Sequence, residues 1–123
     1  MAESLTGGLL AASLTETAGA SATFRGGLVV YATDLKASVA GVPETLLRER
    51  GPVHSDVALA LARGACRVCG ADWGVGLTGV AGPAEQGDRP VGTVCIAVVR
   101  GHFPGYVHCR RRAGSARWSC GAA

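Results

Sequence analysis

Residues 55–79 read SDVALALARGACRVCGADWGVGLTG, which joins an amphipathic stretch to a short apolar one. Ser55 is a favoured residue at a helix N-terminus and Gly70 at a helix end, and the apolar residues between them recur at intervals of three and four. The stretch predicts a helix followed by a strand over 73–78. The predicted buried face of the helix holds Val57, Ala58, Leu61, Ala62 and Ala65.

Other apolar stretches extend this alternation of helix and strand. Residues 27–32 and 91–99 are rich in β-branched residues and predict two more strands, while Thr6 is placed to cap a helix that starts at Gly7 and stops at Gly19. Strands alternating with helices predict an α/β layered sheet, and strands without polar alternation favour an all-parallel one. Ligands bind such sheets at the C-terminal ends of the strands.

Lys36 is the only lysine in a chain that has eleven arginines. An amine can lose its proton near neutral pH, whereas a guanidinium cannot, so Lys36 is a candidate general base. With Ser4 as a hydroxyl nucleophile and Tyr31 as a proton relay, it would make an amide hydrolase of the serine–lysine kind. The competing interpretation is that Lys36 is an ordinary surface lysine.

Length and composition indicate one domain with a real core, because the chain has 123 residues of which 48% are hydrophobic. No apolar run approaches the ~18 residues of a membrane helix, and no secretory signal is recognisable. We therefore expect a soluble, cytoplasmic protein without a membrane partner.

The five cysteines are Cys66, Cys69, Cys95, Cys109 and Cys120. An odd number without a secretory signal predicts reduced thiols rather than disulfides. Cys66 and Cys69 have the spacing of a zinc or redox pair, but the second pair that a zinc site of this type needs is missing. We therefore expect no metal site.

The C-terminal part of the chain differs in charge from the rest. Residues 1–88 hold nine acidic and six basic residues, whereas residues 89–123 hold six arginines and no acidic residue. We divide the chain into a domain over 1–105 and a basic, disordered tail over 106–123. A nucleic-acid arm with Tyr106 and Trp118 as stacking groups is the alternative, but a basic stretch without a pattern is weak support for it, so we expect no nucleic-acid partner.

An ordered series of motifs closely resembles the CinA C-terminal domain family, whose enzymatic members are nicotinamide-nucleotide amidohydrolases of the PncC type. The resemblance covers about residues 2–99. It is carried by AESLTGG at 2–8, AGASATFRGG at 18–27, YATDLK at 31–36, GV at 41–42, ADWG at 71–74, TGVAGP at 78–83 and PVGTV at 90–94.

The resemblance implies a three-layer α/β/α sandwich with a mixed sheet, and hydrolysis of nicotinamide mononucleotide to nicotinate mononucleotide and ammonia without a cofactor. It places the nucleophile on Ser4, the base on Lys36 and the relay on Tyr31. The small-molecule nucleotide would be held by residues of the two glycine-rich loops, and homo-oligomerisation stays open. The substrate-binding residues would be Thr6, Gly7, Gly8, Thr78, Gly79 and Gly82.

Compared with the family, both ends of the chain look shortened. The helix and strand that precede the catalytic motif, and the final amphipathic helix, have no counterpart, so we expect a fold incomplete at its N- and C-termini, without the strand that presents Ser4 and with an apolar sheet face open to water. Two other functions remain: a non-catalytic accessory domain that binds nucleotide or protein, and a degenerate, inactive fragment of the family.

Overall fold

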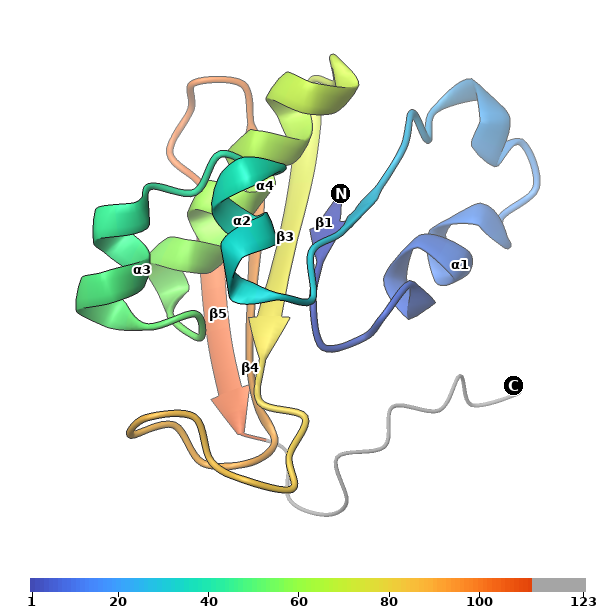
Figure 1. Cartoon of the computed structure of the whole chain (residues 1–123). Helices are drawn as coiled ribbons and strands as arrows, with labels where there is room; N and C mark the ends of the chain where they lie inside the picture. The colour runs from blue at the N-terminus through green and yellow to red at the C-terminus, as the bar shows by residue number, and fades with distance from the viewer. Residues whose placement is uncertain (112–123) are drawn as a thin grey trace.

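A five-stranded mixed sheet forms the centre of the molecule (Figure 1), for which the computed structural model describes residues 1–111. The strand order is β2-β1-β3-β4-β5; β1 lies parallel to both β2 and β3, whereas β4 is antiparallel to β3 and β5. The α/β fold with a mixed sheet is thus confirmed. The strands are β1 (Ala2–Glu3), β2 (Leu28–Val29), β3 (Trp73–Gly79), β4 (Thr93–Arg100) and β5 (Tyr106–Arg111).

The all-parallel sheet favoured by the apolar strands is wrong for β4 and β5. No helix lies between β3 and β4, or between β4 and β5, and a parallel connection needs a crossover of a dozen or more residues, usually helical. These strands therefore turn back directly and pair as antiparallel neighbours.

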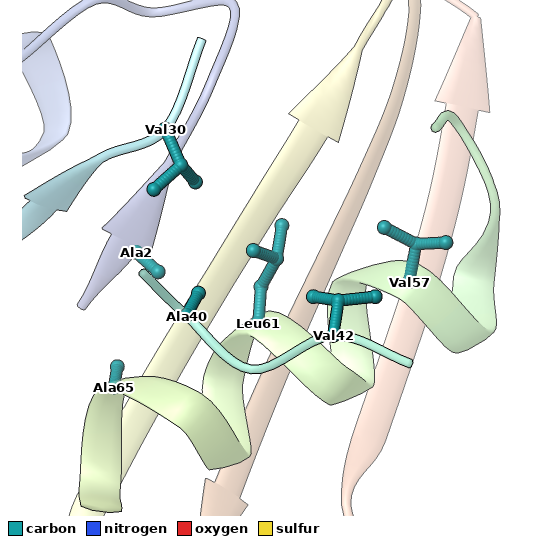
Figure 2. Close-up of a cluster of buried hydrophobic side chains, with 7 residues drawn as sticks. All are labelled: Ala2, Val30, Ala40, Val42, Val57, Leu61 and Ala65. Carbon is teal, nitrogen blue, oxygen red and sulfur yellow. The ribbon is translucent and has the colours of Figure 1, made fainter. Parts of the chain in front are cut away.

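Helix α4 packs along one face of the sheet and forms the main core. Every predicted apolar residue of its inner face is buried, and so is Gly64, which the pattern did not mark. Gly74 and Gly76 of β3 lie so close to the α4 carbonyls of Ala62 and Ala58 that a Cβ on either would collide with them. Figure 2 shows the part of this core where α4 meets β1 and the segment after α2, built from Ala2, Val30, Ala40, Val42, Val57, Leu61 and Ala65.

The remaining helices are short and lie on both sides of the sheet (Figure 1). The segment after α2 reaches the same core as α4, whereas Leu10 of α1 packs with Leu77 on the opposite face of β3. The helices are α1 (Leu9–Thr15), the 3₁₀ helix η1 (Ala20–Ala22), α2 (Thr33–Ser38), α3 (Glu44–Arg50) and α4 (Ser55–Cys69).

The strand that we expected to be missing before Ser4 is present. Ala2 pairs with Leu28 and Gly76, and Glu3 pairs with Val29 and Leu77, so that residues 2 and 3 form a central strand between β2 and β3. Both are fully buried. Two residues are enough here because each is bonded to strands on both sides.

The sheet face that points away from α4 is only partly covered. Leu77 and Val94 pack against Leu5 and Leu10, but Trp73, Ile96 and Tyr106 remain 61%, 39% and 70% exposed. Arg100 lies over the Trp73 ring at 5.5 Å. An apolar sheet face open to water, expected from the sequence, is therefore present in the described part of the chain.

Two expectations about the C-terminal part are corrected. Residues 106–111, assigned to a disordered tail, form β5, while the rest of that tail, with Trp118 and Cys120, lies outside the described residues. Cys95 and Cys109, expected as reduced thiols, face each other across β4 and β5 and are joined by a disulfide. Cys66 and Cys69 are free. Among residues 1–111, no helix combines the length and apolarity that a bilayer span requires.

Candidate active site

The turn after β1 is organised by the carboxylate of Glu3. Its Oε1 accepts hydrogen bonds from the Thr6 hydroxyl at 2.6 Å and from the Gly8 and Leu10 N–H groups at 2.6 and 3.2 Å, and its Oε2 accepts one from the Ala11 N–H at 2.9 Å. Glu3 therefore caps α1, in place of the Thr6 cap that we predicted. The helix itself begins at Leu9, after Gly8 in a left-handed conformation with φ 113°.

Burial of Glu3 and its hydrogen bonds act on its pKa in opposite directions. Burial favours the neutral acid, but the Thr6 hydroxyl and the three N–H groups stabilise the anion and together lower the pKa below its ordinary value. The carboxylate is therefore ionised at neutral pH. It occupies the place where Gly7 and Gly8 were expected to hold the nucleotide.

Ser4 and Lys36 meet directly behind this turn. Lys36 extends from α2, and its Nζ lies 3.1 Å from the Ser4 Oγ, 2.9 Å from the Val30 carbonyl oxygen and 3.1 Å from that of Tyr31. Ser4 is 6% and Lys36 2% exposed. A surface lysine is thereby ruled out.

Burial lowers the pKa of the Lys36 amine to about 8, although the nearby Asp34 carboxylate pulls it upward. The two main-chain carbonyls can only accept hydrogen bonds. When the amine is neutral, its two N–H groups satisfy these carbonyls and its lone pair is left for the Ser4 hydroxyl. The arrangement suits removal of the serine proton near neutral pH.

Tyr31 contributes to this pair through its main chain. Its carbonyl oxygen accepts from Lys36, while its side chain is 60% exposed and lines the rim of the pocket described next. No hydrogen bond between the phenol and Ser4 or Lys36 occurs within residues 1–111. The relay role of the phenol remains a prediction.

A pocket of about 120 Å³ opens in front of Ser4 and Lys36. It lies at the C-terminal ends of β1 and β3, where the sheet topology predicts a ligand site. Lys36 is the one charged side chain among the described residues that line it. The pocket is lined by Ser4, Leu5, Tyr31, Thr33, Lys36, Pro52, Val53, Gln86, Ala84 and residues 78–82.

The structure divides the predicted substrate-binding residues into two groups. Thr78, Gly79 and Gly82 line the pocket, whereas Thr6, Gly7 and Gly8 do not. The Thr6 hydroxyl and Gly8 N–H are bonded to Glu3, and the Gly7 N–H donates to the Ser4 carbonyl at 2.9 Å. These three residues shape the turn behind the nucleophile.

Several lining residues were missed in the sequence. Pro52 and Val53 reach the pocket because the buried Thr78 hydroxyl donates to the Pro52 carbonyl at 2.7 Å, a contact between distant segments that no local pattern indicates. Gln86 lies shortly after the glycine-rich loop 78–83, and this closeness to the predicted loop was the only signal for it in the sequence.

Known proteins match this sequence over most of its length. A sequence model of the CinA C-terminal domain matches residues 1–117. CinA-like proteins of Frankia casuarinae and Geobacter sulfurreducens are 55% and 52% identical over 98 and 99 residues, which is 80% of this chain in each case but 23% and 24% of those proteins. The chain thus spans about a quarter of the length of these relatives.

Solved structures resemble the fold over nearly the whole described chain. The competence/damage inducible protein CihA of Agrobacterium tumefaciens superposes with a TM-score of 0.84 at 40% identity, covering 89% of this chain and 67% of that one. A CinA superfamily protein of Escherichia coli gives 0.86 at 31% identity, covering 94% and 67%. With the family match extending over almost all of its residues, the chain belongs to the CinA C-terminal domain family.

Proposed function

We propose that this chain is an amide hydrolase that converts nicotinamide mononucleotide to nicotinate mononucleotide and ammonia. The observation that carries the proposal is the contact between the buried Lys36 amine and the Ser4 hydroxyl at the pocket. The nature of the substrate is supported by the family resemblance, since family members of the PncC type act on this amide.

The first half of the proposed reaction is acylation of Ser4. Neutral Lys36 takes the proton of the Ser4 hydroxyl as Oγ attacks the carboxamide carbon, and a tetrahedral oxyanion forms. Leu5 lines the pocket, and its N–H donates to no other described residue, so it is available to this oxyanion. Collapse of the intermediate breaks the C–N bond, and the lysine ammonium returns the proton to the leaving nitrogen, which departs as ammonia.

The second half is hydrolysis of the acyl-enzyme. Lys36, again neutral, takes a proton from water, whose oxygen attacks the acyl carbon. The intermediate collapses with release of the Ser4 oxygen, which regains its proton from Lys36. The products are the nicotinate nucleotide and the free enzyme, and each turnover consumes one water.

The direct test is ammonia release from nicotinamide mononucleotide by purified protein. Ser4→Ala and Lys36→Arg should both fold, and each should lose about a thousandfold or more in kcat, because one lacks the nucleophile and the other a base. Arg63→Lys, on the exposed side of α4, is the matched control and should keep the wild-type rate. Equal rates in wild type and Ser4→Ala would refute the mechanism.

The alternative is a non-catalytic accessory domain, and it is favoured by one observation. The curated relatives are about four times as long as the matched segment, so the segment belongs to a larger protein in those cases. Binding of the nucleotide by calorimetry, without any ammonia release, would support this alternative over catalysis.

A further inference from the structure

We infer that Glu3 is a positioning residue for the Ser4 nucleophile, acting through the turn that it bonds. The inference rests on the proposed function in one respect, because it takes Ser4 to be the reactive hydroxyl. It assigns to Glu3 a task beyond capping α1: to fix the direction of Ser4 and to keep the Leu5 N–H free.

Burial and bonding make Glu3 unusual among the acidic residues. It has no exposed surface, yet no arginine, lysine or histidine forms an ion pair with it within the described residues. Its charge is balanced by four donors, which are the Thr6 hydroxyl and the N–H groups of Gly8, Leu10 and Ala11. These donors more than offset the desolvation of the carboxylate, so the ionised side chain holds the turn and the start of α1 firmly in place.

The position of Glu3 connects the sheet to the nucleophile. Side chains alternate along a strand, so Ala2 enters the core under α4, Glu3 turns to the opposite face, and Ser4 would turn back toward Lys36. The main chain of Glu3 is fixed by β2 and β3, while its side chain is fixed by α1. Ser4 is therefore held between two rigid attachments of the preceding residue.

The same bonds determine which main-chain donors remain near the nucleophile. Glu3 takes the Gly8 N–H, and the Ser4 carbonyl takes the Gly7 N–H, so the turn consumes the donors that follow Thr6. The Thr6 hydroxyl donates to Glu3 at 2.6 Å, which fixes the main chain just after Leu5. Loss of the carboxylate would release the Thr6 hydroxyl and the Gly8 N–H at once.

The experiment measures the reactivity of Ser4 without the natural substrate. A fluorophosphonate phosphonylates an activated serine, and its second-order rate constant is measured for wild type, Glu3→Gln, and the matched control Glu16→Gln, which alters an exposed carboxylate just after α1. We expect Glu3→Gln to lower the rate about 10- to 100-fold. The amide NH2 is a donor and would face the N–H groups from which a carboxylate oxygen accepts hydrogen bonds. Glu16→Gln should leave it unchanged.

A loss of folded protein is separated from a loss of positioning by counting active sites. The labelling rate is divided by the amount of protein that is labelled at the end of the reaction. It is measured well below the melting temperature of each variant. With nicotinamide mononucleotide, Glu3→Gln should lower kcat while KM and the midpoint of the pH–rate profile stay near wild type, since Lys36 does not touch Glu3. An unchanged rate per labelled site, with only a lower melting temperature, would overturn the inference.

Thr6 provides a second pair of variants should Glu3→Gln fail to fold. Thr6→Val removes the hydroxyl that donates to Glu3 and should slow labelling several-fold, while Thr6→Ser keeps the hydroxyl and should recover most of the rate. Equal rates in both would contradict the positioning role. A wild-type protein that is labelled at Ser4 but releases no ammonia would refute the proposed function alone, and one that is not labelled would refute the positioning of a reactive serine.

Discussion

Gly64 of α4 lies directly beneath the main-chain carbonyl of Ala40, with no room for a Cβ between them. This contact seats the segment after α2 on the main helix of the fold, and α2 is the helix that carries Lys36. Backbone touches backbone here, so neither side can adapt by changing a rotamer. The close approach therefore links the packing of α4 to the position of the candidate base.

Gly64→Ala should destabilise the protein although alanine is the better helix former. Helix propensity alone favours the alanine variant by about 1 kcal/mol, whereas forcing a methyl group into a packed contact typically costs about 1–3 kcal/mol or more. We expect the packing cost to dominate and the activity to fall with it. Urea unfolding of the variant, with Arg63→Ala as an exposed control on the same helix, measures the difference; a more stable Gly64→Ala would contradict the contact.

The effect of Lys36→Met on the free energy of unfolding should depend on pH. The amine has a folded pKa of about 8 against 10.5 for a free lysine, so between these pH values the unfolded chain binds a proton that the folded chain has released. The free energy of unfolding of the wild type should accordingly increase by on the order of 3 kcal/mol between the two pKa values. This gain is lost again as the pH falls through about 8.

The measurement is the difference in unfolding free energy between wild type and Lys36→Met at several pH values from 7 to 10.5. Other titrating groups cancel in this difference. The difference should shift in favour of wild type by on the order of 3 kcal/mol from pH 7 to pH 10.5; a difference independent of pH would mean that the pKa of the amine is not lowered.

The rate of amide hydrolysis should increase with pH to a plateau. The midpoint of the increase should lie near pH 8, where the Lys36 base becomes neutral. Asp34 raises the pKa of Lys36, so Asp34→Asn should move this midpoint to lower pH and increase the rate at pH 7. Glu49→Gln, an exposed change on α3, is the control of equal charge and should leave the midpoint in place. An equal midpoint in Asp34→Asn and wild type would assign the titration to another group.

Tyr31→Phe should lose far less activity than Lys36→Arg. The bond from Lys36 to residue 31 is made to the main-chain carbonyl, which phenylalanine retains. A loss of less than about tenfold in kcat would restrict the phenol to a minor relay, whereas a loss as large as that of Ser4→Ala would place the phenol in the chemistry itself.

Ile96→Thr should reduce self-association and binding of a hydrophobic dye. Ile96 lies on the partly uncovered sheet face with Trp73 and Tyr106, and an apolar face of this kind promotes association. Threonine keeps the β propensity and removes apolar area. Val29→Thr, an exposed change on β2, is the control. Equal self-association of both variants in sedimentation would mean that another surface mediates the association.

Elements with a long periodic pattern were predictable from the sequence, whereas elements that depend on distant partners were not. The buried face of α4 and the location of β3 follow from apolar spacing alone. Strand β1 has only two residues, too few for any period, and is fixed by β2 and β3. The cap of α1 was assigned to Thr6 by its position, but the carboxylate of Glu3 reaches further and carries a full charge.

The site was predictable to the extent that its residues are chemically unusual or belong to family motifs. Lys36 is the only lysine of the chain, which made it a candidate base. Its burial beside Ser4 agrees with that interpretation. The wall made by Pro52 and Val53 was not predictable, because it depends on a hydrogen bond from Thr78 across the fold.

The insertion of β1 between β2 and β3 has a consequence for the order of folding. Its partners lie far along the chain, at residues 28–29 and 76–77, so β1 can dock only after both flanking strands have come together. Such non-local pairing is slow, whereas α4 and the β3–β4 hairpin depend on contacts closer in sequence. Ser4 follows β1 directly and reaches Lys36 only when this strand is in place. The return of serine reactivity during refolding would therefore report the closing of the sheet, and would come after the helix signal rather than with it.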